Sequence, residues 1–377
     1  MINLEGLGRV ATGSSYGAIA HDEHARKAVQ KALSKVDQSS IGSVLLFLTG
    51  AYAHKPQNAI KEAVKAAGTP LVFGCCAMGL LSDQEWLLDV EGAVAMVFPR
   101  ELGLQPLSVM LQQGVEPSMV LTLSSPNAAA IAINSHARPQ TGAIASDEFG
   151  HGPFSVWQSG RIVEREFMHA ALAVPLQHHC VLAHGVRHIS PTMQINRADR
   201  HRLFEIGEKP SVDNLLRHLP QNMQQIGLEH PYNLLCAVSE NNDPESIQQG
   251  HYDLHHVVST QQDSEQEVCL SGTTKAGRHM FWALRDAQLA QLNLHRKLLQ
   301  LRSSIKGEPE FAFMFANISR GPEFYDGPDR DLEIFKEIFP HTPLLGFYSN
   351  GEIAPGHKLP AFVHRYSTVV SLFTADN

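Results

Sequence analysis

The sequence lacks several features that would assign it to a large functional class. Its 377 residues carry a net charge of −8 without a clustered run of Lys and Arg. Phosphate binding needs such clusters, which argues against nucleic acid as a main partner. No apolar run reaches the ~18 residues of a membrane span, and the N-terminal residues lack the basic start and apolar core of a secretory signal. These absences favour a globular protein.

Cysteine is scarce and irregularly spaced. The five cysteines are an odd number, and no two of them form a CxxC pair. Neither a disulfide framework nor a structural zinc site is therefore indicated, and a reducing cytoplasm is the expected location. The sequence also has neither a GxSxG nucleophile elbow nor a Walker A loop.

Histidine, by contrast, is abundant, with 21 residues. The densest stretch runs from His178 to His188. Alternation along a strand would place His184 and His188 on one face, although Gly185 interrupts that pattern. Histidine ligates metals and haem iron, so His184 and His188 are candidate axial ligands. The spacing permits haem without specifying it, and most of the histidines are expected to be ordinary surface residues.

Two stretches far apart in the chain follow one pattern. Each begins with Thr-Pro and an apolar pair and then carries two glycines five positions apart, Gly74/Gly79 and Gly346/Gly351. Each also closes a strand–helix–strand unit, which favours parallel strands with a right-handed crossover. The first unit comprises Ser43–Leu48, Asn58–Ala67 and Leu71–Gly74, and the last comprises Phe311–Ala316, Asp329–Phe339 and Leu344–Phe347.

The expected fold is therefore α/β, with two related halves, mixed sheets and strand–helix–strand units. We expect two domains, residues 1–205 and 206–377, because 377 residues exceed one ordinary core. Among the remaining segments, Leu107–Leu111 is predicted to be a strand. The polar stretch Asp199–Gln225 is predicted to be helical and to contain the domain boundary.

Polar residues concentrate at strand ends in the last unit, where open α/β sheets tend to bind ligands. Arg320, Gly321, Gly351, Glu352 and His364 are the candidate ligand-binding residues there. Arg320 would hold a carboxylate and Glu352 an amine. The alternative is that Arg320 and Glu352 pair with each other and fasten their loops together.

The earlier glycine loop contributes Gly74 and Cys75 as further candidates for the ligand site. Cys75 or Cys76 would act as a catalytic nucleophile only if a base or a positive environment lowered its pKa. The favoured interpretation is that both are small apolar residues at a strand end. We expect no catalytic residue, and a cysteine-dependent enzyme is the alternative.

The ordered set of these segments resembles the FIST family. The C-terminal half carries the clearer resemblance, in the segments 315–321, 343–353 and 364–367. The N-terminal half resembles the family through the segments 74–79 and 89–94, and the middle through 184–189 and 213–216. The chain departs from the family at Asn317 and Val186, where the family often has cysteine.

The resemblance implies a sensor of a small ligand. One bacterial branch of stand-alone FIST proteins binds haem and senses nitric oxide, and passes the signal to a histidine kinase or a cyclic-di-GMP enzyme. The most specific function that the resemblance implies is a haem b sensor of nitric oxide in which His184 or His188 is the axial ligand. A ligand-independent interaction scaffold, as in the F-box members of the family, is the other alternative.

Overall fold

The computed structural model describes residues 9–36, 41–147, 150–221, 234–261, 266–356 and 359–375. The fold is α/β with mixed sheets, as expected from the sequence. The chain divides into two compact units, one of Met1–Leu182 with Leu294–Asn377 and one of Ala183–Asn293. The second unit is therefore an insertion in the sequence of the first, a grouping that differs from a division at residue 205.

The larger unit contains three copies of one arrangement. Each copy has an edge strand, a helix, a strand, a second helix, a parallel strand, a hairpin and a returning antiparallel strand. The first copy consists of β1 (Ala11–Gly17), α1 (Glu23–Leu33), β2 (Ile41–Thr49), α2 (Gln57–Ala67), β3 (Val72–Ala77), β4 (Leu80–Ser82), β5 (Trp86–Leu87) and β6 (Glu91–Pro99).

The second copy consists of β7 (Leu104–Pro106), α3 (Leu107–Gln112), β8 (Val120–Ser124), α4 (Ala129–Asn134), β9 (Gln140–Ile144), β10 (Val156–Gln158), β11 (Arg161–Ile162) and β12 (Phe167–Leu172). The third consists of β13 (Gln177–His184), α8 (Ala287–Ser304), β21 (Phe311–Asn317), α9 (Pro322–Tyr325), α10 (Arg330–Ile338), β22 (Leu344–Ser349), β23 (Gly351–Gly356), β24 (Leu359–His364) and β25 (Ser367–Thr374). The two strand–helix–strand units predicted from the sequence are confirmed, and the structure adds a third between them.

The three copies form three sheets of the same strand order. The orders are β1-β6-β2-β3-β10-β11, β7-β12-β8-β9-β23-β24 and β13-β25-β21-β22-β4-β5. The central pairs β2/β3, β8/β9 and β21/β22 are parallel, and the strands that flank them are antiparallel. Each helix-linked parallel pair thus lies in the middle of a mixed sheet.

The hairpin of each copy pairs with the sheet of another copy. Hairpin β4–β5 of the first copy joins β22 of the third, and β10–β11 of the second joins β3 of the first. Hairpin β23–β24 of the third copy joins β9 of the second, which completes the cycle. The three copies are therefore interlocked around one body.

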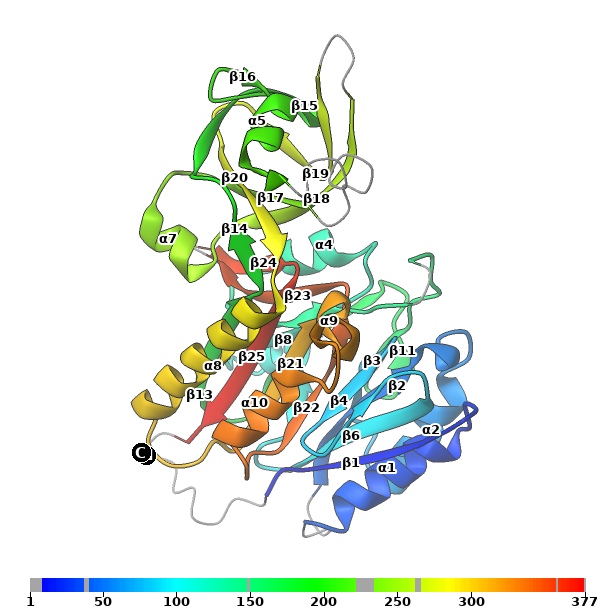
Figure 1. Cartoon of the computed structure of the whole chain (residues 1–377). Helices are drawn as coiled ribbons and strands as arrows, with labels where there is room; N and C mark the ends of the chain where they lie inside the picture. Colours follow the sequence, from blue (N-terminus) through cyan, green and yellow to red (C-terminus); the bar gives the residue numbers. More distant parts are fainter. Residues whose placement is uncertain are drawn as a thin grey trace. The chain divides into compact units, whose positions relative to one another are not determined.

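A shared apolar core lies between the three sheets, and helices cover their outer faces. Side chains from each sheet meet in that core, among them Phe47, Leu123 and Phe347, with the rings of Phe47 and Phe347 4.8 Å apart. Helices α1 and α2 lie on the outer face of the first sheet (Figure 1). Their alanine-rich faces pack against alternate residues of that sheet, such as Leu46 and Cys76. This alternation follows the two-residue period of a strand.

One glycine in each copy permits the close pairing of the two parallel strands. A Cβ added at Gly74, Gly142 or Gly346 would lie 1.7, 1.8 or 1.6 Å from a carbonyl oxygen of the neighbouring strand. At Gly74 and Gly142 the backbone also has φ +151°, which L side chains rarely adopt. The first glycine of each repeated stretch, Gly74 or Gly346, is therefore required by the close pairing of two parallel strands. The second copy has the equivalent glycine, Gly142.

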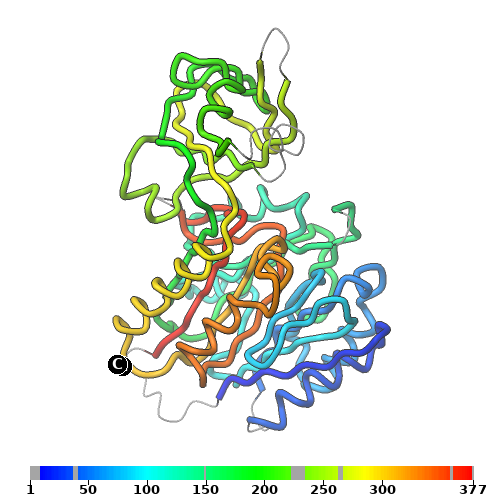
Figure 2. Tube along the Cα trace, viewed as in Figure 1, coloured from blue at the N-terminus to red at the C-terminus, as the bar shows by residue number. Residues whose placement is uncertain are grey.

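The inserted unit forms a small antiparallel barrel, traced in green to yellow in Figure 2. Strand β20 pairs with β17 and also with β15, so the ring β20-β17-β18-β19-β15 closes on itself around an apolar core. Its elements are β14 (Val186–His188), β15 (Met193–Ile206), β16 (Lys209–Pro210), α5 (Ser211–His218), β17 (Leu234–Ser239), α7 (Pro244–Gln249), β18 (Asp253–Thr260), β19 (Val268–Lys275) and β20 (His279–Arg285).

Two sequence predictions of local structure are wrong. Residues Leu107–Gln112 form helix α3 where a strand was expected. The polar segment from Asp199 was expected to be helical, but its first part belongs to the long strand β15, and only Ser211–His218 is a helix. Residues 222–225 lie outside the described residues. Pairing with β19 and β20 overrides the polar composition of β15.

The described helices include none that is both long and apolar enough to cross a membrane.

Candidate functional site

The polar residues predicted from the sequence lie where strands β21 and β22 end. Gly351 and Glu352 do not form a loop there, because Gly351–Gly356 is strand β23, paired with β9 on one side and β24 on the other. Arg320 ends a single turn of 3-10 helix directly after β21. This edge is the one where parallel sheets commonly place functional groups.

Glu352 is fully buried and bound by three side-chain donors. Ser349 Oγ lies 2.6 Å and Asn317 Nδ2 lies 3.1 Å from its Oε1, while Ser367 Oγ lies 2.5 Å from Oε2. Burial raises the pKa of Glu352 to about 7, although these hydrogen bonds oppose the shift. The carboxyl group can therefore change its protonation state near neutral pH.

The repeated architecture shows how unusual this carboxylate is. In the strand registers, Cys75 lies opposite Val156, Phe347 opposite Leu80, and Ala143 opposite Glu352. The three hairpin residues thus occupy equivalent positions, and Leu80 and Val156 belong to the shared apolar core. A carboxylate replaces an aliphatic side chain in one copy of three.

His364 is the cross-strand neighbour of Glu352. The two residues are Cα partners in the β23–β24 register, so their side chains extend from the same face of the sheet. His364 is 1% exposed and its ring meets that of Phe362 edge to face at 5.0 Å. The strand register thus brings together two of the candidate ligand-binding residues predicted from the sequence.

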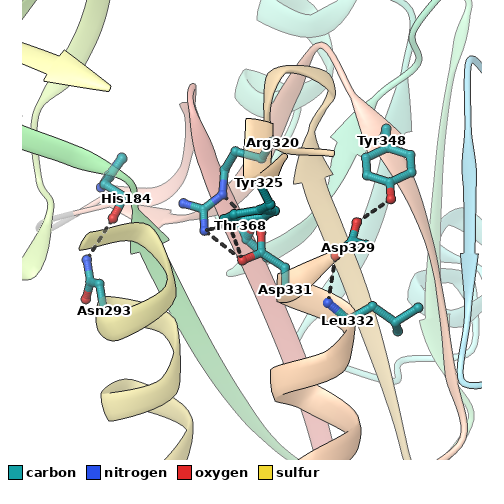
Figure 3. A network of polar contacts seen from close by, with 9 residues as sticks. All are labelled: His184, Asn293, Arg320, Tyr325, Asp329, Asp331, Leu332, Tyr348 and Thr368. Atoms are coloured by element: carbon teal, nitrogen blue, oxygen red, sulfur yellow. Dashed lines mark hydrogen bonds and ion pairs between the residues drawn. The ribbon is translucent and has the colours of Figure 1, made fainter. Parts of the chain in front are cut away.

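Arg320 belongs to a second buried cluster (Figure 3). Asp331 binds its guanidinium bidentately, with Nε–Oδ2 and Nη2–Oδ1 distances of 3.0 and 2.8 Å. Tyr325 Oη lies 3.0 Å from Arg320 Nη2, and Thr368 Oγ1 donates to Asp331 Oδ2 at 2.6 Å. Burial alone would lower the pKa of Arg320, but Asp331 and Tyr325 outweigh it and raise that pKa.

A third carboxylate, Asp329, begins helix α10. It accepts a hydrogen bond from the backbone nitrogen of Leu332 at 2.8 Å and another from the hydroxyl of Tyr348. Burial and then repulsion by Asp331 raise the pKa of Asp329 to about 6. Asp329, Asp331, Tyr325 and Tyr348 carry no local sequence motif beyond the Asp N-cap, so the sequence analysis missed them.

The two clusters lie on opposite faces of the third sheet. Two consecutive residues of β25 contact different clusters, because Ser367 donates to Glu352 and Thr368 donates to Asp331. Consecutive side chains of a strand point to opposite faces of its sheet. The carboxylate that binds Arg320 is thus Asp331 and not Glu352, the partner considered from the sequence. Arg320 and Glu352 do not extend from one face as two ends of a ligand clamp.

The other three candidates for the ligand site, Gly321, Gly74 and Cys75, lie at positions where they serve packing. Gly321 precedes α9, and a Cβ there would meet Tyr348 at 3.4 Å. Gly74 lies in β3, and the Cys75 side chain is buried in the shared apolar core. Burial raises the pKa of Cys75 well above its usual range and also raises that of Cys76. Neither thiol has the lowered pKa that a nucleophile needs.

His184 and His188 lie in aromatic surroundings in the inserted unit. The His184 ring is 3% exposed and stacks on Tyr252 at 4.8 Å. His188 is exposed, stacks on Phe281 at 3.9 Å, and meets Tyr252 edge to face at 6.3 Å. Desolvation by the surrounding groups lowers the pKa of His188, which favours the neutral imidazole, the form that ligates iron. His184 is buried and His188 is exposed, and axial ligation of iron by either residue stays a prediction.

No group of three metal-ligating side chains is found in the part of the chain that the structure describes.

A cavity of about 500 Å³ lies elsewhere in the larger unit, at the ends where β1, β21 and β22 begin. It is lined by Arg9, Val10, Ala11, Thr12, Lys35, Asp83, Glu308, Pro309, Glu310, Pro340, His341, Thr342 and Pro343. Its size is typical of small-molecule sites. The sequence did contain a signal, since the Thr342-Pro343 pair that opens the repeated stretch lines this cavity. A second cavity, near α3, measures about 130 Å³.

The chain matches two family models in succession. The FIST N domain matches residues 43–209 and the FIST C domain matches residues 212–355. Together they cover most of the 377 residues, and the chain therefore belongs to the FIST family. FIST domains are generally small-ligand sensory domains in signalling proteins. The junction between the two matches falls within the inserted unit, between β16 and α5.

The curated relatives are distant and uncharacterized. A protein of Mycobacterium bovis and one of Mycobacterium tuberculosis are each 23% identical to this chain over 199 residues. That alignment covers 52% of this chain and 50% of each relative, so the chain spans about half the length of the relatives it matches. Another Mycobacterium tuberculosis protein is 24% identical over 108 residues, 28% of this chain and 27% of the relative.

Proposed function

We propose that this chain is a cytoplasmic sensory protein whose small ligand binds in the cavity of about 500 Å³. The cavity is the single observation that carries the proposal. Membership of the FIST family supports the sensory role, and the mixture of apolar and charged lining residues supports binding of a small polar molecule.

In this proposal the buried clusters around Glu352 and Arg320 have a structural role. Their polar groups bind one another, as in a network that fixes one arrangement of strands. Ligand binding at Gly351 and Glu352 stays a prediction, and it would require the buried carboxylate to become accessible.

A blocking variant tests the cavity as the ligand site. His341 is an exposed residue of its lining, so His341→Trp would obstruct the cavity without changing the core. Compounds from a small-molecule library that raise the melting temperature of the wild type should lose their effect in this variant. Ile131→Trp, at a residue 65% exposed on α4, is the matched control and should keep the effect. Hits that act equally on both variants would place the site elsewhere.

The finer form of the proposal is a haem b sensor of nitric oxide in which His188 holds the iron. What supports it is the donor chemistry of the inserted unit: an exposed, neutral imidazole flanked by Phe281 and Tyr252. Bound ferrous haem would supply the affinity for nitric oxide. The chain's own residues would orient the imidazole, which stacks on Phe281 and meets Tyr252 edge to face.

Reconstitution with haem tests this finer proposal. Wild-type protein should give a Soret band, and His188→Ala should lose it, whereas His151→Ala at an exposed residue should keep it. A wild type without a Soret band, or a His188→Ala variant with an unchanged one, would remove haem from the proposal. Sensing of another ligand in the cavity would be unaffected by that result.

The downstream partner in this proposal is a histidine kinase or a cyclic-di-GMP enzyme. FIST domains belong to signalling proteins, and the family match is what supports such a partner. A cysteine-dependent enzyme has no support in the geometry, because Cys75 and Cys76 are buried and their pKa values are raised.

A further inference from the structure

The second cavity of the larger unit, about 130 Å³ in size and called here the α3 cavity, reaches into the apolar core. Met119, Leu176 and Phe373 line it and are also members of the shared apolar core. Met110 of α3 is a further buried residue of the lining. The α3 cavity thus differs from the cavity of about 500 Å³, whose lining contains charged residues of both signs.

Backbone polar groups of the α3 cavity are already bound within the protein. The nitrogen of Val115 donates to the carbonyl oxygen of Met110 at 3.0 Å. The nitrogen of Ala173 donates to the carbonyl oxygen of Gly103, also at 3.0 Å. Two further residues of the lining are prolines, which have no N–H to offer. A ligand in this cavity therefore gains little from polar groups of its own.

The lining also lacks a free charge to attract an ion. Among the described residues of the lining, the one ionisable side chain is Glu116. Arg138 binds its carboxylate, with Arg138 Nε 2.9 Å from Glu116 Oε2. Glu116 is also exposed, so water solvates its charge. A charged ligand would lose hydration in the apolar part of the cavity without gaining a counter-charge there.

The volume of the α3 cavity limits the size of its ligand. An apolar cavity of about 150 Å³ in another protein stays dry and binds benzene or xenon. At about 130 Å³, the α3 cavity fits one ring of that size. Met110 and Met119 of its lining have flexible side chains whose sulfur atoms contact aromatic rings favourably.

Apolar side chains are also exposed beside the α3 cavity. Val109 and Leu111 of α3 are each 36% exposed, and Val115 of the lining is 40% exposed. Large apolar side chains that are exposed together in one short segment are typical of binding surfaces. Their position next to an apolar cavity indicates a ligand of the same character.

We infer that the α3 cavity binds a neutral, apolar small molecule with the size of a single aromatic ring. The inference goes beyond the proposed function, because it adds a second site of different chemistry to the cavity of about 500 Å³. Binding is driven by removal of apolar ligand surface from water and by contact with the thioethers, and it requires no hydrogen bond.

A series of ligands that share one ring tests the inference on the wild-type protein. Saturation-transfer NMR detects bound toluene, and ethylbenzene, benzylamine and benzoate are then added as competitors. Benzylamine and benzoate should each need at least about tenfold higher concentration than ethylbenzene to displace toluene, because their charge must be desolvated. Equal competition by benzoate or benzylamine would overturn the inference. Absence of toluene binding would also overturn it and leave the exposed side chains of α3 as a protein contact.

Two variants of the lining locate the binding. Ala173→Phe and Ser118→Phe place a ring at exposed positions of the α3 cavity, so they fill its space without changing its buried residues. Each should weaken toluene binding about tenfold or more. Ala130→Phe, at an exposed residue of α4 outside the lining, is the matched control and should keep the wild-type affinity. Thermal unfolding checks the fold of each variant. Wild-type affinity in both folded lining variants would overturn the assignment.

The variant His341→Trp separates this inference from the proposed function. Because His341 lines only the cavity of about 500 Å³ of the two described, toluene binding should be unchanged in His341→Trp. If toluene binding is lost in His341→Trp but kept in Ala173→Phe and Ser118→Phe, the apolar site fails and the larger cavity remains the ligand site.

Discussion

The third repeat differs from the other two at equivalent positions of one backbone arrangement. Two donated hairpins place Leu80 and Val156 in the shared apolar core, whereas the third places Glu352. Only this hairpin residue is bound by three polar side chains, and the same repeat holds the buried Arg320–Asp331 pair. The three repeats therefore share the apolar character of their strands, and the third also places buried charged side chains at its strand ends.

The largest effect is expected from a feature that all three repeats share. Gly346→Ala would place Cβ 1.6 Å from the carbonyl oxygen of Met314 and should cost more than about 5 kcal/mol or prevent folding. Urea unfolding and soluble yield measure this cost. Gly50→Ala is the control, because nothing lies within 4 Å of its added Cβ. Equal stability of the two variants would show that the parallel strands need no glycine.

The second effect concerns the ion pair found in the third repeat. Asp331→Asn should lower the free energy of unfolding by about 4 kcal/mol, because it leaves the buried Arg320 charge without its counterion. Urea unfolding again provides the measurement. Glu333→Gln on the same helix breaks a solvent-exposed pair with Arg330 and should cost less than about 1 kcal/mol. A small loss in Asp331→Asn would mean that Arg320 is well solvated.

The third effect separates Glu352 from its aliphatic counterparts by its pH dependence. Because burial raises the pKa of Glu352 to about 7 from 4.5, the folded state binds the proton more tightly than the unfolded state. This contribution to stability is full below pH 4.5 and is lost as the pH rises through 7, a change of about 3 kcal/mol.

Unfolding free energies at pH 4.5 and pH 8 measure this dependence. Glu352→Gln should remove about 3 kcal/mol of the wild-type decline, since Gln does not titrate. Leu80→Met, at the equivalent position of the first hairpin, should leave the decline unchanged. An identical pH profile in Glu352→Gln and wild type would contradict the raised pKa of Glu352.

The smallest effect concerns the buried cysteines, which we expect not to react with a thiol reagent. Cys75, Cys76 and Cys236 are buried, and burial raises the pKa of each thiol, so a thiol reagent should not modify them in the native protein. The exposed Cys180 and the partly exposed Cys269 should be the residues that react. Mass spectrometry after brief labelling identifies the modified residues. Rapid modification of Cys75 would restore the cysteine-dependent alternative.

Sequence reasoning identified the local units better than their assembly. The apolar strands β2 and β21 and the helices α2 and α10 follow from periodicity. The second repeat escaped notice because Arg138-Pro139 stands where the others have Thr-Pro, and because Asp147 stands five positions after Gly142, where the others have their second glycine. The exchange of hairpins depends on long-range pairing, in the case of β4 with β22 across more than 250 residues, which local patterns do not encode.

The candidate site was predictable in part. Glu352 and His364 were both predicted as candidates in the last unit, and the strand register makes them neighbours. Asp331 was missed because its partner Arg320 lies 11 residues away across two short turns. Glu310 and Asp83 line one cavity, but Asp83 follows β4 and Glu310 precedes β21, so only tertiary folding brings them together.

The cyclic exchange of hairpins governs the order in which the chain can fold. Hairpin β4–β5 is complete by residue 87, but its partner β22 begins at residue 344. An emerging N-terminal half therefore exposes an unpaired strand edge until nearly the whole chain has been made. Such long-range pairing slows folding and favours a single late, cooperative transition. A fragment ending near residue 209 would lack β21, β22, β23 and β25, so the FIST N segment cannot complete its sheets on its own.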